Sequence, residues 1–363
     1  MLQCEALSSL GVKVTLYGRR AEPDEYKLVD RINAYYGVDS SNINFQTYFH
    51  RGNYAISLII AFIAVRRIMQ SDRDHVILSR NLYASWILAF IFKRALIYET
   101  HQLEFGIKKI MQKAIMLCPR TVTVVISNHL KTCLADHHGA SPNRCFVLHD
   151  AAPDGIKPTT KKQRRNLLIK YTSLASRKWS LICGYFGHLY PGRGIEMVKG
   201  IAAKRPNCLF LVYGGTESDL NFFRKSNCLE NLVFMGHVPN SKSRELMLLM
   251  DVLLMPYQRN VSIGNGRHDT GRWMSPIKMF EYLASGVPIV SSDLPVLKEI
   301  LRHGENCLLV EPDDLSAWLS AIDIIEVNRS LADRLGKNAH TDYKKNYTWK
   351  CRAEKIIEVL KQS

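Results

Sequence analysis

Residues 275–295 carry the pattern that most restricts the fold, because they read as one helix followed directly by one buried strand. Ser275 is suited to cap the helix and Pro276 to its first position, where a missing N–H costs nothing. Gly286 is suited to end the helix in a left-handed conformation, and residues 287–290 form a short apolar run of the kind that parallel sheets bury. The segment predicts a helix–strand unit of a parallel α/β domain.

A single carboxylate interrupts the apolar face of this predicted helix. Glu281 shares that face with Ile277 and Phe280 at helical spacing, so its side chain is expected to be buried. A buried carboxylate is costly unless it is hydrogen-bonded, and the two hydroxyls of a sugar diol would satisfy it. We therefore interpret Glu281 as a ligand-binding residue.

Strand and helix patterns alternate along most of the chain, as in doubly wound parallel sheets. The strands expected in the first series are 12–17, 43–49, 75–79, 95–99, 121–127 and 144–148, and the helices 2–10, 55–69, 83–92, 105–117 and 128–138. The strands expected in the second series are 180–186, 208–213, 232–235, 252–256, 287–290 and 306–310, and the helices 195–203, 243–250, 276–285, 315–327, 331–339 and 348–363. The two series predict two consecutive α/β domains, which the length of 363 residues also favours.

The charge of the chain is uneven. The net charge is +16, and residues 1–180 carry 26 Lys and Arg against 13 Asp and Glu. A basic half favours an anionic partner, either a membrane surface or a phosphorylated acceptor, although a solvated basic face is the alternative. Nucleic acid is not expected, because no recognition motif and no aromatic–basic pattern is present. The longest apolar run, 54–65, is too short to span a bilayer and is interpreted as a core helix.

The nine cysteines are dispersed, without a Cys-x-x-Cys pair or a Cys/His cluster at zinc spacing. This pattern predicts free thiols in a reducing cytoplasm and no metal site.

The glycine-rich segment 184–194 lies between an expected strand and an expected helix. Glycines in such a loop let backbone N–H groups approach a phosphate, and the N-terminus of the following helix adds partial positive charge. Arg193 can hold a diphosphate through two parallel hydrogen bonds, whereas a solvated Arg193 and a strand-capping His188 are the alternative.

His101 directly follows the expected strand 95–99. Strand ends of this kind face the ligand crevice in open α/β sheets, so His101 is a candidate site residue. A lone histidine is more often structural, which is the alternative.

The segment 275–295, with its Ser-Pro-x-Lys-x-Phe-Glu-Tyr start and its Asp-Leu-Pro end, resembles the donor-site signature of family-four (group 1) retaining glycosyltransferases. The resemblance implies the GT-B fold, in which two Rossmann-like doubly wound domains face each other across a cleft. It also implies a nucleoside-diphosphate sugar as donor, no metal and no other cofactor. In this family Glu281 would accept hydrogen bonds from both ribose hydroxyls.

The resemblance also implies the domain limits. Residues 1–155 would form the acceptor-side domain, joined by the C-terminal helix 349–363, and 156–179 would be the linker. Residues 180–348 would form the nucleotide-sugar-binding domain. The family pattern begins with a strand and a glycine-rich loop that have no counterpart before the helix 2–10, so the first domain is expected to be incomplete at its N-terminus.

The residues that match the family positions receive roles in the same way. Catalytic roles fall to His101, Arg193 and Glu281. Contacts to the donor diphosphate fall to Gly187, His188, Arg193, Ile277 and Lys278. Contacts to the nucleoside fall to Gly214, Gly215, Gly236, His237, Val238 and Glu281. Weaker contacts to the donor sugar fall to Trp273, Met274, Ser275 and Pro276, with Asp269 and Arg272 as further candidates. Acceptor or membrane contacts are assigned to Arg51, Arg80, Lys108 and Lys109.

Two positions depart from the family pattern. His188 stands where the family has the first of two cations, and Trp273 stands where many members have a second Glu directed at the transferred sugar. The first departure bears on how the diphosphate is held, and the second on which sugar is transferred.

The expected function is that of a retaining glycosyltransferase moving a hexose to a glycan or lipid-linked acceptor in cell-surface polysaccharide or glycolipid synthesis. It would act in the cytoplasm, peripherally at the inner face of the membrane. The alternatives are a catalytically impaired relative that still binds nucleotide, a sugar-nucleotide epimerase, and a basic scaffold on a lipid surface.

Overall fold

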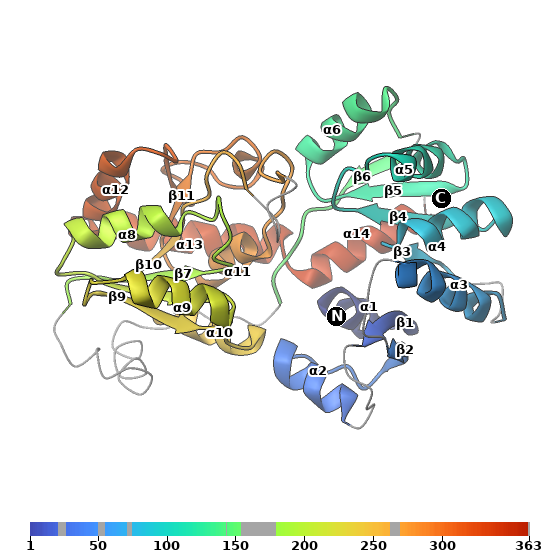
Figure 1. Ribbon diagram of the computed structural model, residues 1–363, viewed down its shortest axis with the longest axis horizontal. Helices are drawn as coiled ribbons and strands as arrows, with labels where there is room; N and C mark the ends of the chain where they lie inside the picture. Colours follow the sequence, from blue (N-terminus) through green and yellow to red (C-terminus); the bar gives the residue numbers. More distant parts are fainter. Residues whose placement is uncertain are drawn as a thin grey trace. The chain divides into compact units, whose positions relative to one another are not determined.

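The structure is a computed structural model that describes residues 1–20, 27–49, 55–70, 75–142, 144–153, 179–261 and 269–361. It divides into two compact units, shown in Figure 1. The first unit consists of Met1–Asn33, Val38–His149 and Arg352–Ser363, and the second of Ala34–Gly37 and Asp150–Cys351. Most of the C-terminal helix thus belongs to the first unit. The expected linker 156–179 lies outside the described residues except for Trp179, as does Arg51.

The second unit contains, among the described residues, a parallel sheet of six strands in the order β9-β8-β7-β10-β11-β12. The strands are β7 (Ile182–Phe186), β8 (Leu209–Tyr213), β9 (Leu232–Gly236), β10 (Val252–Met255), β11 (Ile289–Ser292) and β12 (Leu308–Val310). This is the strand order of a Rossmann fold, in which the direction of winding reverses between the first and fourth strands, here β7 and β10.

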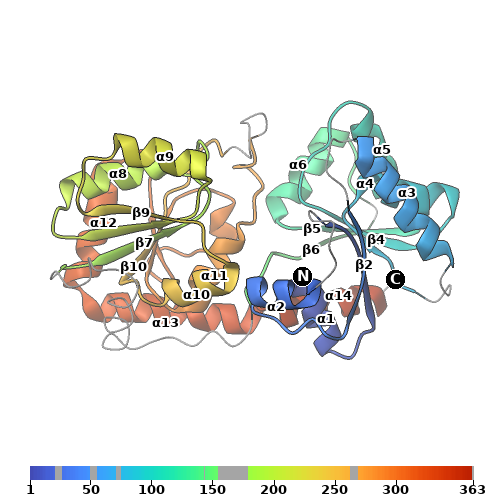
Figure 2. The same ribbon diagram turned by 60° about the horizontal axis from the view of Figure 1, so that its bottom comes forward.

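Helices cover both faces of this sheet (Figure 2). One apolar core joins the sheet to α8 (Ile195–Lys204), α9 (Glu217–Ser226) and α12 (Leu315–Val327). The other core joins it to α10 (Asn240–Met247), α11 (Ile277–Ser285) and α13 (Arg329–Asn346). Strands buried on both faces explain the continuous apolar runs in the sequence.

The first unit divides its described strands between two parallel sheets. β1 (Val14–Arg20) pairs with β2 (Ile43–Phe49), while β3 (Leu78–Ser79), β4 (Leu96–Thr100), β5 (Thr121–Val125) and β6 (Cys145–Val147) form the second sheet in sequence order. The described helices are α1 (Leu2–Ser9), α2 (Leu28–Tyr36), α3 (Ala55–Gln70), α4 (Leu82–Trp86), the π-helix η1 (Ile87–Ile91), α5 (Ile107–Leu117), α6 (Asn128–His138) and α14 (Trp349–Lys361).

The C-terminal helix packs on this second sheet. Ile356 and Val359 of α14 share an apolar core with Val122 and Val124 of β5. The chain therefore uses its last residues to cover a sheet made from residues before 150.

Several elements differ from the sequence-based expectation. The helix expected over 83–92 is α4 continued by a π-helix, because Phe92 N bonds to Ile87 O five residues earlier. β3 keeps only two of the expected residues, and α13 extends to Asn346, well beyond the expected end at 339. The helices α2 and α9 were not predicted.

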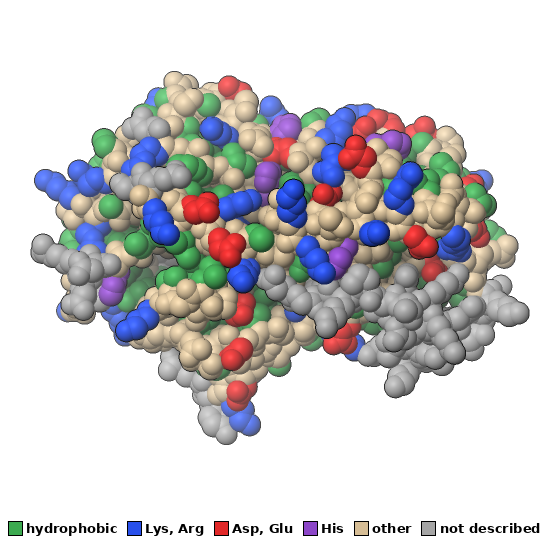
Figure 3. Space-filling view, turned by 180° about the vertical axis from the view of Figure 1, so that it is seen from behind, with side chains coloured by type: hydrophobic (Ala, Val, Ile, Leu, Met, Phe, Trp, Pro, Cys, Tyr) green, Lys and Arg blue, Asp and Glu red, His purple; other side chains and the backbone are tan. Residues whose placement is uncertain are grey.

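Figure 3 shows Lys and Arg side chains spread over the face that it draws, with Asp and Glu among them. No helix in the described ranges combines the length and the apolar character needed to cross a bilayer.

Candidate functional site

The sheet of the second unit opens where its strand order reverses. β7 and β10 pair only as far as Gly184 and Leu253. Beyond that point the hydroxyl of Tyr282 accepts a hydrogen bond from Phe186 N (2.9 Å) and donates one to Leu254 O (3.4 Å). Tyr282 of α11 thus satisfies the backbone groups that the diverging strands expose. Open α/β sheets bind their ligands beyond such a reversal.

The loop after β7 and the loop after β10 are in direct backbone contact. Gly194 begins α8 with a φ of +81°, and a Cβ there would lie 1.7 Å from Pro256 O. Only glycine fits both the conformation and the contact. Gly192 O accepts a hydrogen bond from Gln258 N (2.9 Å). No side chain caps α8, so its first N–H groups remain available to a ligand.

The two glycine turns assigned to the nucleoside are joined to Gly187, which was assigned to the diphosphate, at the same edge of the sheet. Gly187 N donates to Tyr213 O (3.0 Å), and Gly214 N donates to Gly236 O (2.8 Å). A Cβ on Gly214 would lie 1.9 Å from Gly187 O, so this close approach requires glycine. Gly215 follows directly, with its Cβ position 2.7 Å from Leu189. Backbone hydrogen bonds between the turns therefore hold this edge of the sheet together.

Positive side chains converge on the loop after β7. The imidazole of His188 stacks on Tyr190 with a centroid separation of 4.9 Å. Burial lowers the pKa of His188, and the nearby cations Arg193, His237 and Lys278 lower it further. The pattern describes a positive site that favours an anion and disfavours a protonated His188. His237 itself is exposed, and Val238 is half-buried.

Arg193 is held by an aromatic ring and not by an acid. Its guanidinium lies 5.2 Å from the centroid of the Tyr257 ring, a cation–π contact. Its Nε is buried and has no hydrogen-bond partner among the described residues. Burial raises the pKa of the Tyr257 hydroxyl, and Arg193 opposes that shift. A half-buried arginine whose buried Nε keeps a spare donor suits an anionic ligand.

Glu281 is fully buried, as its position on the helix face predicted. Its Oε1 accepts a hydrogen bond from Asn240 Nδ2 (3.0 Å), and Arg244 Nη1 lies 4.0 Å away. Lys278 Nζ lies 2.7 Å from Oε2, but Oε2 has no aligned hydrogen bond among the described residues. Oε2 is therefore paired with the Lys278 ammonium and keeps an acceptor position for a ligand hydroxyl.

Burial lowers the pKa of Arg244, and Glu281 opposes that shift. Asn240 Oδ1 in turn accepts a hydrogen bond from Arg244. Asn240 and Arg244 of α10 orient Glu281, and sequence reasoning missed both. Their spacing of four residues on one helix was the available signal.

The start of α11 differs from the prediction for Ser275. Pro276 is the N-cap residue and Ile277 the first helical residue, so Pro276 lies one position earlier than expected. The Ser275 hydroxyl accepts a hydrogen bond from Asp150 N (3.2 Å) and does not cap the helix. The N–H groups of Ile277 and Lys278 thus lack a side-chain cap. Ile277 is exposed, whereas Lys278 Nζ bonds to Ser243 Oγ (3.1 Å).

The weaker sugar candidates are mostly enclosed. Trp273 and Met274 are 7% and 8% exposed, which leaves little side-chain surface for a sugar. Asp269 Oδ1 accepts hydrogen bonds from Val261 N and Gly271 N, both at 2.8 Å, and so is committed to the backbone. Arg272 is exposed, and residues 262–268 lie outside the described part of the chain.

His101 belongs to the first unit, where it follows β4 as expected. Its Nε2 lies 2.9 Å from Oε1 of Glu99, a side chain with no exposed surface. The same oxygen meets Arg80 Nη2 (2.7 Å) and Arg352 Nη2 (2.9 Å). Burial alone would raise the pKa of Glu99, but Arg352, His101 and Arg80 lower it far below its usual range.

Sequence reasoning missed Glu99. A carboxylate directly after the apolar run Leu96–Tyr98 was a signal, but its partner Arg352 is distant in sequence. Arg80 was assigned to acceptor or membrane contacts, yet it bonds to Glu99.

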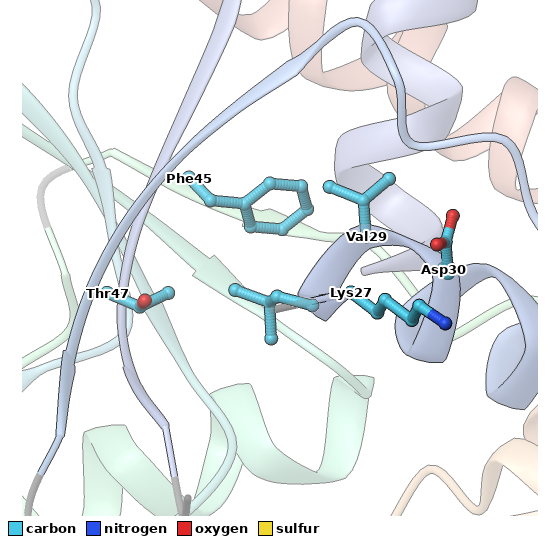
Figure 4. Close-up of a pocket in the computed structure, with 6 residues that line it drawn as sticks. Lys27, Val29, Asp30, Phe45 and Thr47 are labelled. Atoms are coloured by element: carbon cyan, nitrogen blue, oxygen red, sulfur yellow. The ribbon is translucent and has the colours of Figure 1, made fainter. Parts of the chain in front are cut away.

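A small pocket of about 270 Å³ lies elsewhere in the first unit. Figure 4 shows Phe45 and Thr47 of β2 facing the start of α2, with Lys27, Val29 and Asp30. None of the candidate site residues lines it, so we do not assign the donor to it. Within the described ranges, no group of three His, Cys, Asp or Glu could hold a metal ion.

Comparison with known proteins identifies relatives of the second unit. Residues 182–325 match the family model described as glycosyl transferases group 1. The chain is 26% identical over 243 residues to the capsular polysaccharide biosynthesis glycosyltransferase CapM of Staphylococcus aureus, covering 63% of this chain and 58% of CapM. It is 28% identical over 151 residues to the phosphatidyl-myo-inositol mannosyltransferase of Mycobacterium leprae, covering 42% and 37%. The matches thus span less than two thirds of these relatives.

Solved structures extend the likeness to the whole chain. HepE of Anabaena in complex with UDP superposes with a TM-score of 0.73 at 14% identity, over 97% of this chain and 100% of HepE. A glycosyltransferase from Rickettsia africae superposes with a TM-score of 0.74 at 15% identity, over 99% and 94%. At these identities the likeness establishes the fold, which is GT-B as the sequence predicted.

Proposed function

We propose that this chain, whose residues 182–325 match the family model of group 1 glycosyltransferases, is a retaining glycosyltransferase. It would move a hexose from a nucleoside-diphosphate sugar to a glycan or lipid-linked acceptor, in cell-surface polysaccharide or glycolipid synthesis. The observation that carries the proposal is the buried Glu281, with one oxygen lacking an aligned donor. A ribose diol supplies the missing hydrogen bond.

The donor diphosphate would bind to the cations around the loop after β7. Arg193 and Lys278 lie close enough to His188 to lower the pKa of its imidazole. The uncapped N-termini of α8 and α11 add N–H donors for the same anion. Preorganised donors of this kind stabilise the negative charge that develops on a leaving diphosphate. The proposed reaction uses these donors in place of a metal ion.

In the proposed reaction the acceptor oxygen attacks the anomeric carbon from the face that the diphosphate leaves. The bond from carbon to phosphate oxygen breaks as the bond to acceptor oxygen forms, and the acceptor proton passes to the leaving phosphate. No protein nucleophile is needed for this route. His101, held by Glu99 in the first unit, is assigned to the donor sugar and the acceptor.

The partners follow from the same proposal. The donor is a nucleotide sugar and the acceptor a glycan or lipid-linked glycan. We propose that the protein acts in the cytoplasm and binds the inner face of the membrane through its basic first half. Residues 1–180 contain 26 Lys and Arg but only 13 Asp and Glu.

Calorimetric titration with UDP, GDP, ADP and CMP tests the proposal on the wild type and Glu281→Ala. Micromolar binding of one nucleotide, lost in Glu281→Ala, supports the donor site. Turnover with the matching sugars then separates an enzyme from a relative that only binds. If none of the four nucleotides binds to the folded wild type, the proposal is wrong.

A further inference from the structure

Three neighbouring helical segments of the first unit expose large apolar side chains. On α5 and directly before it, Phe105, Ile107 and Ile110 are 52%, 78% and 70% exposed. On α3, the side chains of Leu58, Ile59 and Phe62 are each more than half exposed. Ile91 at the end of η1 is also more than half exposed, and Phe92 after it is exposed. Large apolar side chains exposed in this number on packed helices are typical of an interaction surface.

These segments form one layer of the first unit. α4 packs against both α3 and α5, and η1 packs against α3. Figure 2 shows α3, α4 and α5 side by side. We call the exposed residues of α3, η1 and α5, with Phe92 and Phe105, the outer helical face.

The same layer carries cations and no acids. The sequences of α3, α4, η1 and α5 contain no Asp or Glu. They contain five basic residues: Arg66, Arg67, Lys108, Lys109 and Lys113. Lys93, which follows η1, is also exposed.

α5 has the residue distribution of a helix that lies at a membrane surface. α5 buries Gln112, Ile115 and Met116 and turns Ile107 and Ile110 outward, beside Lys108 and Lys109. Lys108 Nζ lies 5.9 Å from the ring centroid of Tyr83 on α4. Apolar tips flanked by long cationic side chains suit the boundary between lipid headgroups and acyl chains.

We propose that the outer helical face docks on an anionic lipid surface. Apolar side chains would enter the headgroup region while the lysines and arginines meet lipid phosphates. A second copy of the chain is a poorer occupant, because a symmetric contact would place helices that carry Lys and Arg but no Asp or Glu against themselves. The inference deepens the proposed function, since a lipid-linked acceptor would be presented at that surface.

Vesicle co-sedimentation tests this docking without any donor or turnover, so its failure leaves the donor-site proposal untouched. The probes are vesicles of phosphatidylcholine alone and vesicles in which about one third of the lipid is phosphatidylglycerol and the rest phosphatidylcholine. The wild type is expected to bind only the anionic vesicles, and binding should weaken as salt rises. Lys108→Gln with Lys109→Gln should lower the partition coefficient about thirtyfold, at roughly 1 kcal/mol for each basic residue.

A second variant removes the apolar contribution. Ile107→Ser with Ile110→Ser should lower binding at least tenfold. The matched control is Val327→Ser, because Val327 of α12 is 80% exposed but lies in the second unit. Thermal unfolding and nucleotide binding, measured on each variant, show that the fold persists.

Two results would overturn the inference. One is wild-type binding that is absent, or that is equal on neutral and anionic vesicles. The other is a concentration-dependent dimer, seen by analytical ultracentrifugation and abolished by the same substitutions, which would assign the face to a second copy.

Discussion

Glu281 in the second unit and Glu99 in the first are both buried carboxylates, but they differ in their hydrogen-bond and ion-pair partners. Both side chains have no exposed surface, and in both Oε1 receives the protein's hydrogen bonds. Glu99 meets two guanidinium groups and an imidazole at 2.7–2.9 Å. Glu281 has one amide at 3.0 Å and a guanidinium at 4.0 Å, with its lysine on the other oxygen.

The difference teaches that burial alone does not mark a binding residue. Arg352 is only 2% exposed and ties α14 to β4 through Glu99, so that carboxylate is committed to the fold. Glu281 contacts Lys278, which is a quarter exposed and can turn to solvent when a ligand arrives. We infer that Glu99 stabilises the first unit and positions His101, whereas Glu281 serves a ligand.

The largest effect on stability should come from Glu99→Gln. The substitution leaves the buried Arg352 without its counter-charge and should lower the free energy of unfolding by about 3 kcal/mol. Urea unfolding measures it. Arg80→Gln is the control, because Arg80 is half exposed and its loss should cost much less. A cost below about 1 kcal/mol for Glu99→Gln would remove the contrast with Glu281.

A smaller effect is expected on ligand affinity from Arg193→Gln. The guanidinium would be replaced by a neutral group, with a loss of about 2 kcal/mol, or roughly thirtyfold in the dissociation constant. Nucleoside diphosphate should be affected more than the corresponding nucleoside. Calorimetry with both ligands checks this difference, and equal losses for the two would remove Arg193 from the diphosphate site.

The pH dependence of stability separates Glu99 from a neutral replacement. The pKa of Glu99 is lowered by Arg352, His101 and Arg80 against the opposing effect of burial. Glu99 therefore binds a proton more readily in the unfolded chain than in the folded one. Its contribution to the free energy of unfolding is complete above the ordinary glutamate pKa of about 4, and it is lost as the pH falls towards the lower pKa of the folded state. The advantage of wild type over Glu99→Gln should shrink from about pH 5 downwards in urea titrations. An advantage that grows on acidification would contradict the account.

The smallest effect should follow Lys278→Met. Lys278 is a quarter exposed, and the buried Glu281 keeps Asn240 and Arg244 beside it when Lys278 is lost, so the free energy of unfolding should change by about 1 kcal/mol. Nucleotide affinity should fall only a few-fold, since Arg193 remains. A loss as large as that from Arg193→Gln would mean that Lys278 holds the diphosphate directly.

The sequence predicted the second unit better than the first for a physical reason. Residues 276–290 carry local signals for a helix, a glycine stop and a buried strand, and the structure has α11, a left-handed Gly286 and β11. The prediction for Ser275 failed because its hydroxyl binds Asp150 N, a partner 125 residues away.

In the first unit the decisive contacts are also distant in sequence. Arg352 reaches Glu99 across 253 residues, and periodicity cannot reveal such a pair. The π-helix arises from a register change in hydrogen bonding inside an apolar run that reads as ordinary helix. By contrast, the box of Thr216 and Asp219 that caps α9 was visible in the sequence, and we overlooked it.

The role of Glu281 is tested most directly by one binding cycle. The nucleoside diphosphate that binds best and its 2′-deoxy analogue are titrated into the wild type and Glu281→Gln, with Glu305→Gln as an exposed control. If Glu281 accepts from the ribose, wild type and control should lose at least tenfold in affinity with the deoxy analogue, while Glu281→Gln loses little more. Equal losses from the deoxy analogue in all three proteins would contradict the account.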